Sequence, residues 1–170
     1  MKRVARFNMI SFGQWKNDII DTFGEFKFTE EEIKKMYESI QIPQRATKFS
    51  AGYDFHTPVG FALEPGETIK IPTGIRCEMN TDVVLLIHVR SSLGFKYNVL
   101  LANTTGVIDA DYAYAKNEGH IFVKLVNNGR GIVEVNPGDA ICQGIFQEYC
   151  ITEDDAVETS RTGGIGSTGR

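Results

Sequence analysis

The sequence predicts a mainly β protein, a β-sandwich or jelly roll that carries an N-terminal helical hairpin and ends in a flexible arm. Apolar residues follow a helical period from residue 11 to 41, whereas short strand-like runs between Gly, Pro and Asn turns begin after Pro43. Many short strands at this spacing are typical of sandwiches and jelly rolls. We therefore expect a helical extension over residues 1–41, a β domain over 42–151 and an arm over 152–170.

Two helices are expected in the N-terminal range. The segments that begin at Ser11 and Thr29 both have the form of a capping box, with Gln14 and Glu32 three residues later. Apolar residues at spacings of three and four follow each box: Trp15, Ile19 and Phe23 after the first, and Ile33, Met36, Tyr37 and Ile40 after the second. We interpret them as a hairpin packed on the β domain or on a neighbouring subunit, with a module for a protein partner as the alternative.

Strands are expected in the β domain wherever a short apolar run lies between turn residues. These runs cover residues 67–71, 83–89, 121–126, 132–135 and 141–146. Similar Pro-Gly turns precede the first and last of them, at Glu64 and Asn136. After Ile151 the chain becomes acidic and then rich in glycine, which predicts a solvated, flexible arm.

Composition sets the class of protein and its partners. A chain of 170 residues with 42% hydrophobic residues can bury one core, and its net charge of −4 without a long Lys/Arg cluster argues against a nucleic-acid-binding surface. Cys77, Cys142 and Cys150 lack CxxC spacing, so we expect small buried hydrophobes in a reducing compartment. No apolar run approaches the roughly 20 residues of a membrane helix. We therefore expect a cytoplasmic protein that binds a free nucleotide rather than nucleic acid or a membrane.

One segment carries the clearest chemistry, the ten residues from Asn103 to Tyr112. Val107 and Ile108 are interpreted as the end of a buried strand, which would hold Asp109 at the rim of the core. A carboxylate in such a place can have its position and pKa controlled, as a general base requires. Asp109 is therefore the candidate base.

Two other segments are suited to phosphate. Arg90 is followed by two hydroxyls, Ser91 and Ser92, and the glycine-rich end from Arg161 to Gly169 could fold backbone amides around a second anion. The chain has no P-loop and no strand-GxGxxG-helix unit, which argues against kinase-like and dinucleotide-binding folds. One base and two phosphate cradles suggest nucleotide hydrolysis.

Five segments taken in order resemble the motifs of the homotrimeric dUTPase family: Ser50 to Phe55, Arg90 to Lys96, Asn103 to Tyr112, Gly138 to Gln143, and Arg161 to Gly169. The resemblance runs from about Pro43 to the last residue. It implies a jelly-roll subunit that assembles as a homotrimer with active sites shared among the three chains. It also implies that the chain hydrolyses dUTP to dUMP and pyrophosphate with Mg²⁺ as cofactor.

The resemblance assigns roles residue by residue. Asp109 would activate the attacking water and reach the sugar 3′-hydroxyl, and Tyr112 would pack on the deoxyribose. The uracil would be read by Asn103, Gly106, Val107 and Ile108. Phosphate oxygens would be held by Arg90, Ser91, Ser92 and Gln143, and Asp54 would contact magnesium through water. The closing arm would supply Arg161, Gly163, Gly164, Ile165, Gly166, Ser167 and Thr168. The catalytic set would be Asp109, Asp54, Arg90 and Gln143.

The chain departs from the family pattern in two places that concern the nucleoside. About five extra residues separate Tyr112 from Gly119, so the edge of the hairpin should be remodelled. Ile165 stands where the family often has a phenylalanine stacked on uracil. The alternatives are a dCTP deaminase of the same fold and a regulatory module in which bound nucleotide switches contacts to a protein partner through the N-terminal helices.

Overall fold

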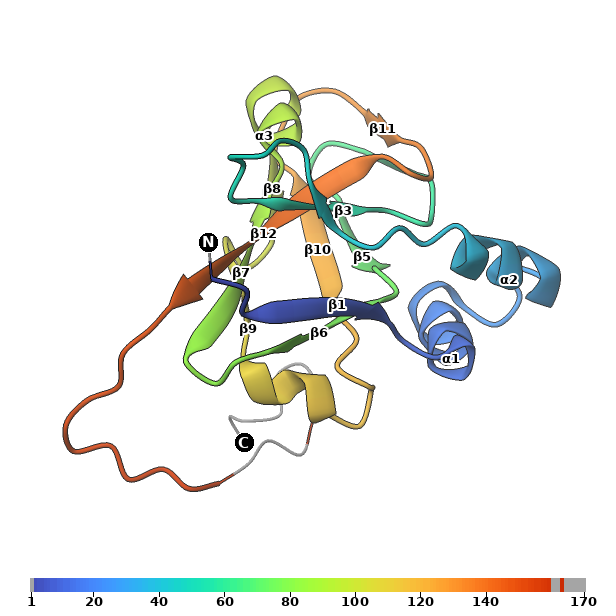
Figure 1. Ribbon diagram of the computed structural model, residues 1–170. Coiled ribbons are helices and arrows are strands. Elements are labelled where there is room, and N and C mark those ends of the chain that lie inside the picture. Colours follow the sequence, from blue (N-terminus) through green and yellow to red (C-terminus); the bar gives the residue numbers. More distant parts are fainter. Residues whose placement is uncertain (1, 160–162, 164–170) are drawn as a thin grey trace.

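The computed structural model describes residues 2–159 and 163, and its architecture is a layered antiparallel β structure (Figure 1). A five-stranded sheet has the order β2-β3-β12-β7-β9 and a three-stranded sheet has the order β5-β10-β8. Two further pairs are β1-β6 and β11-β4. The predicted mainly β sandwich fold is therefore confirmed.

The strands of these sheets are β1 (Ala5–Met9), β2 (Gln44–Arg45), β3 (Tyr53–His56), β4 (Phe61–Leu63), β5 (Thr68–Pro72), β6 (Ile75–Met79), β7 (Val83–Val89), β8 (Val99–Leu101), β9 (Gly106–Ile108), β10 (Phe122–Asn127), β11 (Val133–Val135) and β12 (Ala140–Glu148). The helices are α1 (Phe12–Phe23), α2 (Glu30–Glu38), α3 (Ser91–Tyr97) and the 3-10 helix η1 (Ala110–Tyr114). Each of the five predicted strands is present, with its ends shifted by two residues or fewer.

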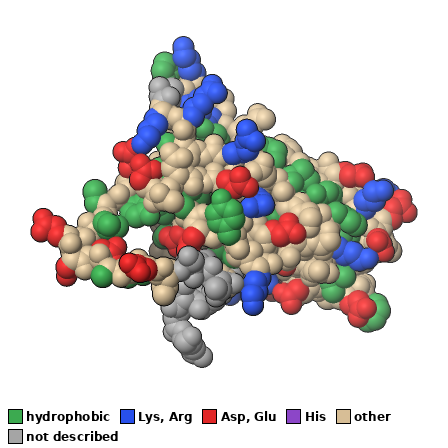
Figure 2. Space-filling view, turned by 60° about the horizontal axis from the view of Figure 1, so that its bottom comes forward, with side chains coloured by type: hydrophobic (Ala, Val, Ile, Leu, Met, Phe, Trp, Pro, Cys, Tyr) green, Lys and Arg blue, Asp and Glu red, His purple; other side chains and the backbone are tan. Residues whose placement is uncertain are grey.

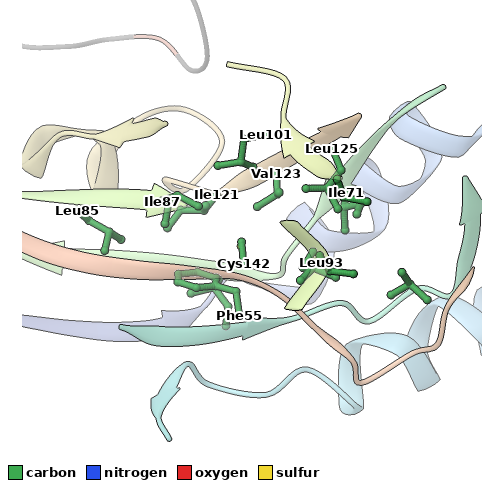
Figure 3. Close-up of a cluster of buried hydrophobic side chains, with 14 of the residues drawn as sticks. Phe55, Ile71, Leu85, Ile87, Leu93, Leu101, Ile121, Val123, Leu125 and Cys142 are labelled. Atoms are coloured by element: carbon green, nitrogen blue, oxygen red, sulfur yellow. The ribbon is translucent and has the colours of Figure 1, made fainter. Parts of the chain in front are cut away.

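The main core lies between the two larger sheets (Figure 3). Phe55, Leu85, Ile87 and Cys142 come from the five-stranded sheet, and they meet apolar side chains of the three-stranded sheet: Ile71, Leu101, Val123 and Leu125. Burying one such large side chain contributes about 1.5–3 kcal/mol. The facing apolar layers therefore hold the sandwich closed.

The cysteines follow the sequence-based expectation in part. Cys77 and Cys142 are free and buried in the core, and burial raises the pKa of the Cys77 thiol to about 12. Cys150 is exposed, because it follows the end of β12 where the chain leaves the sandwich. The expectation of burial was wrong for this one residue.

The N-terminal range is not helical throughout, since residues 5–9 form β1. This strand pairs antiparallel with β6, from Ala5 opposite Met79 to Met9 opposite Ile75. β1 was not predicted, because five residues with one basic side chain and an asparagine give a weak strand pattern. Residues 5–9 are therefore part of the β structure, although they fall within the range expected to be helical.

The two expected helices form a hairpin at one end of the molecule (Figure 1). They surround a second apolar cluster of Ile10, Trp15, Ile19, Ile33 and Val59. The Trp15 indole N–H donates to the Ile33 carbonyl over 3.1 Å, which joins α1 to α2. The capping box at Thr29 is complete. At Ser11 only one of the two bonds is formed, in which the Gln14 backbone N–H donates to the Ser11 hydroxyl. The Gln14 side chain instead donates to Asp18.

A fully buried histidine connects α1 to the β structure. His120 Nδ1 lies 2.6 Å from Asp18 Oδ2 of α1, and its Nε2 accepts the Gly74 backbone N–H over 2.8 Å. Because Nε2 is an acceptor, Nδ1 carries the proton and donates to the carboxylate. Burial lowers the pKa of His120, and the hydrogen bond to Asp18 opposes that effect.

This arrangement predicts that acid destabilises the fold. A histidine in the unfolded chain binds a proton near pH 6.5, whereas the folded state resists protonation of His120 because its pKa is lowered. The contribution is complete above about pH 6.5 and declines as the pH falls toward the folded-state pKa, with a slope of at most about 1.4 kcal/mol per pH unit. Urea unfolding between pH 8 and pH 5 measures this slope.

The matched control is His120→Gln, which cannot titrate but leaves His56 and His88 unchanged. Its free energy of unfolding should depend less on pH than that of the parent. Equal pH slopes in the two proteins would contradict this account of His120.

Candidate active site

Three of the predicted catalytic residues come together at one end of the five-stranded sheet. Gln143 of β12 lies directly opposite Asp54 of β3 and His88 of β7 in the strand register. Residues opposite one another in antiparallel strands point to the same face. Arg90 follows β7, and its Nη2 lies 3.4 Å from Asp54 Oδ2. The sheet thus places a cation, an amide and a carboxylate on one surface.

The Gln143 side chain occupies space that only a glycine leaves open. A Cβ atom added to Gly52 would overlap Gln143 Oε1 and crowd its Cδ. Gly52 immediately precedes β3, so the backbone and the amide approach each other at the sheet end. The small residue therefore fixes where the amide lies.

The two serines extend this polar surface. Ser91 and Ser92 are exposed in the first turn of α3, and Arg90 is the N-cap residue. The Leu93 N–H already donates to the Arg90 carbonyl over 3.0 Å, whereas the hydroxyls and N–H groups of Ser91 and Ser92 can donate to an anion. Buried Leu93 anchors the same turn in the core.

A second group of predicted residues lines a cavity of about 420 Å³ beside β9. The residues that the sequence analysis named there are Asn103, Gly106, Val107, Ile108, Asp109 and Tyr112. Apolar side chains of Ile87, Leu101 and Phe122 complete its walls. The cavity has the size and the mixed lining of a small-molecule site.

Two lysines of this cavity were missed by sequence reasoning. Lys70 and Lys124 lie directly opposite each other on β5 and β10, and both contribute to the cavity lining. Each is an isolated charge in a strand, and only the strand register brings them together. Lys70 also lies over the Phe122 ring, with its Nζ 5.1 Å from the ring centroid.

The strand before Asp109 exists, but it is not buried as expected. β9 lies at the edge of the five-stranded sheet, and the Val107 side chain is 59% exposed. Successive side chains of a strand point to opposite faces, so only every second residue of β9 faces the core. Val107 points to the other face, which is open at this edge of the sheet. Ile108 packs against the core, and half-buried Asp109 follows at the N-cap of η1.

Tyr112 is held firmly within η1. Its ring is buried and lines the cavity, and its hydroxyl donates to the His120 carbonyl over 2.7 Å. The same hydroxyl accepts a hydrogen bond from Asn117 Nδ2 over 2.9 Å. The segment after Tyr112 thus forms the end of η1 and a turn that returns to the Tyr112 hydroxyl.

The residues expected to bind phosphate and the cavity beside β9 lie at different ends of β7. Ile108 pairs with Leu85, five residues before Arg90. Asp109 is therefore level with Val84, and at about 3.4 Å per residue roughly 20 Å of strand separates it from Arg90. One chain therefore does not bring its own Asp109 and Arg90 to the same phosphate.

The C-terminal segment leaves the body after β12 and extends outward (Figure 1). Acidic side chains gather on this projecting segment (Figure 2), which contains Glu153, Asp154, Asp155 and Glu158. Gly163 of the predicted arm site is described, in a bend. The other predicted arm residues lie outside the described residues: Arg161, Gly164, Ile165, Gly166, Ser167 and Thr168.

Within residues 2–159 and 163, no three His, Cys, Asp or Glu side chains gather as a metal site. No helix in the same part of the chain is long and apolar enough to span a bilayer.

The fold and these two sites define a β-sandwich protein with a sheet end that carries a cation, an amide and hydroxyls, and with a cavity of small-molecule size. The chain belongs to the dUTPase family, whose model matches residues 38–169.

Proteins similar to this chain support the assignment. A deoxyuridine 5′-triphosphate nucleotidohydrolase of Lactococcus lactis is 39% identical over 81% of this chain and 95% of its own length. One of Nautilia profundicola is 34% identical over 82% of this chain and 98% of its own. The crystal structure of a dUTPase from Streptococcus mutans is similar with a TM-score of 0.63 and 28% identity, over 86% of this chain and 98% of the other.

A more distant structure shares the fold. A dUTPase of phage phi11 of S. aureus is similar with a TM-score of 0.65 and 20% identity, over 94% of this chain and all of the other. That structure was used to describe the coordination of a structural Mg(II) ion.

Proposed function

We propose that this protein hydrolyses dUTP to dUMP and pyrophosphate, which removes a precursor of uracil in DNA and supplies dUMP. The observation that carries the proposal is the cavity of about 420 Å³ in which a half-buried carboxylate, Asp109, lies beside a buried aromatic ring, Tyr112. Membership of the dUTPase family and the names of the relatives support dUTP as the substrate. The same names favour this reaction over the deamination of dCTP.

The cavity accounts for recognition of the nucleoside. Asn103 and the backbone of β9 offer hydrogen-bonding groups for the edge of uracil, in a pattern that the edge of cytosine does not satisfy. Gly106 lets β9 approach β7 closely, because a Cβ atom there would lie 3.1 Å from Ile87 Cβ. The Tyr112 ring forms the wall against the deoxyribose and leaves no room for a 2′-hydroxyl.

Asp109 acts as the general base. Its carboxylate takes the proton of a water molecule as the water oxygen attacks the α-phosphorus, and the bond from that phosphorus to the bridging oxygen breaks to release pyrophosphate. The neighbouring sugar 3′-hydroxyl contacts the same carboxylate. Substrate and base are thereby held in one orientation.

The sheet end accounts for the grip on the phosphates. Arg90 supplies a bidentate cation, and Ser91, Ser92 and Gln143 supply neutral donors to phosphate oxygens. The arm would close over the nucleotide, with Arg161, Ser167 and Thr168 on the γ-phosphate and Ile165 over the base. Arg90 and Arg161 would offset the negative charge of the phosphates, and the neutral donors would orient their oxygens.

Magnesium is the proposed cofactor. The ion prefers oxygen ligands and keeps several waters, and it is commonly held by one or two carboxylates together with substrate phosphates. Asp54 fits a contact through water, because its carboxylate is largely buried and its Oδ2 already faces Arg90. When bound, the ion would supply positive charge that stabilises the leaving pyrophosphate.

We further propose a homotrimer in which each active site is shared. The separation of Asp109 from Arg90 along β7 supports this arrangement, because the Arg90 that meets the phosphates at one cavity would come from another chain. A helical extension outside the common core and a cytoplasmic location belong to the same proposal, and the free thiols of Cys77 and Cys142 fit a reducing compartment. A protein partner at the helical hairpin would meet Phe26, which is 94% exposed between α1 and α2.

Replacement of the base should separate binding from chemistry. Asp109→Asn keeps the shape of the side chain but cannot accept the proton, so turnover of dUTP should fall by about 10² to 10⁴. Pyrophosphate release measures turnover, and titration with a non-hydrolysable dUTP analogue should give nearly parental affinity. The control Asp82→Asn changes an exposed carboxylate paired with Lys2 and should hydrolyse dUTP normally. Parental turnover in Asp109→Asn would show that another group is the base.

Displacement of Gln143 should weaken the phosphate grip. Gly52→Ala places a methyl group where the Gln143 amide lies, so one hydrogen bond to a charged oxygen is lost. Such a bond contributes about 1.5–3 kcal/mol, which predicts a drop in kcat/KM of roughly tenfold to a hundredfold. Gly131→Ala is the matched control, because its Cβ would meet nothing within 4 Å. Equal kcat/KM in the two variants would rule out this role for Gln143.

Mixing inactive chains tests the shared site. Asp109→Asn and Arg90→Ala chains should each be nearly inactive alone, since every site lacks either the base or the cation. After joint refolding, some mixed trimers contain a site with both groups, so activity should return. Light scattering gives the oligomeric state. An active monomer, or a mixture no more active than its parts, would refute shared sites.

A further inference from the structure

The turn that follows η1 is a feature that the proposed reaction does not use. It consists of residues 115–119, within the extra segment that separates Tyr112 from Gly119. Glu118 and Gly119 both have positive φ angles, of 58° and 71°. A Cβ on Gly119 would overlap the backbone of Ala113, so the turn folds tightly back on η1. Arg76 of β6 also binds this segment, because its Nη2 donates to the Ala113 carbonyl over 2.9 Å.

The N-terminus of α1 is bonded directly to this turn. Glu118 Oε2 accepts the Ser11 backbone N–H over 2.7 Å, and Glu118 Oε1 accepts the Ser11 hydroxyl over 2.6 Å. These two hydrogen bonds lower the pKa of the Glu118 carboxyl, so the group is a carboxylate at neutral pH. Ser11 is also the N-cap of α1. The bond to Glu118 therefore fixes the turn to the start of a helix.

A second bond from α1 holds the other side of the turn. Asp18, two helical turns after Ser11, accepts from His120 Nδ1 over 2.6 Å. Trp15 lies between them on the same helix and contacts the imidazole, with ring centroids 6.2 Å apart. Residues 118 and 120 are thus both bonded to the α1 segment, and their partners there, Ser11 and Asp18, are about 7 residues apart.

The Tyr112 hydroxyl is bonded to the residues on either side of Glu118. Asn117 donates to it and the His120 carbonyl accepts from it. A movement of the turn would therefore move the far end of the Tyr112 side chain, while the ring of the same side chain lines the nucleoside cavity. The hydrogen bonds from α1 to the turn and from the turn to Tyr112 form one network, which restricts these side chains more than either bond does alone.

We propose that α1 is a positioning element of the nucleoside cavity: through Ser11–Glu118 and Asp18–His120 it holds the turn that fixes the Tyr112 ring, and so sets the selectivity for deoxyribose over ribose. This inference rests on the proposed function, because it assigns Tyr112 to the sugar. Glu118 and Asn117 are positioning residues in this scheme, and they touch no substrate. A ring that can tilt leaves space for a 2′-hydroxyl, whereas a fixed ring does not.

The test compares kcat/KM for dUTP with kcat/KM for UTP. Glu118→Ala and Asn117→Ala should each lower the dUTP:UTP ratio roughly threefold to tenfold, the range for one lost hydrogen bond. The change should lie in KM rather than in kcat, because Asp109 is untouched. Ser11→Ala should behave in the same way, and Ser11→Thr, which keeps the hydroxyl, should restore the ratio. Lys116→Ala alters an exposed residue of the same turn and is the matched control.

A double-mutant cycle separates positioning from a general loss of stability. Tyr112→Phe removes the hydroxyl through which the turn acts, so Glu118→Ala should leave the dUTP:UTP ratio unchanged in that background. The same loss of ratio in both backgrounds would overturn the inference. An unchanged ratio for Glu118→Ala in the parent, with dUTP still hydrolysed, would also overturn it. A parent chain that does not hydrolyse dUTP would instead reject the proposed function, and this inference with it.

Discussion

The antiparallel register of β7 with its two neighbours is the constraint on which the rest of the structure depends. On one side it places Gln143 opposite His88, and on the other it places Ile108 opposite Leu85. A shift of one residue would turn every side chain of β7 to the opposite face, so Leu85 and Ile87 could not remain in the core. Hydrophobic burial in this strand therefore determines where the polar groups of both sites lie.

Much of the fold could be predicted from local pattern, because strands with continuous apolar runs and helices with caps carry their own signal. The 83–89 strand and the capping box at Thr29 are examples. β1 could not be predicted, since its stability comes from pairing with β6, about seventy residues away. The exposure of Val107 depends on the edge position of β9, which a single strand sequence does not encode.

The candidate site was predictable where motifs are contiguous and unpredictable where the register assembles it. Asp109 and Tyr112 lie within ten residues of Asn103, and they share the cavity as expected. The pairing of Lys70 with Lys124 joins two strands more than fifty residues apart, and neither lysine is unusual in its own segment. The division of the site between two ends of β7 likewise follows only from strand pairing.

The bond between Ser11 and Glu118 spans 107 residues of sequence, which has a consequence for synthesis of the chain. At about 5–20 residues per second, Glu118 is added roughly 5 to 20 s after Ser11. During that interval the apolar partners of α1 become available in chain order, Ile33 of α2 first and Val59 later. The helical hairpin is thus the part of the molecule that can assemble first on the ribosome, and the tyrosine wall of the cavity is completed only after the later strands have docked against it.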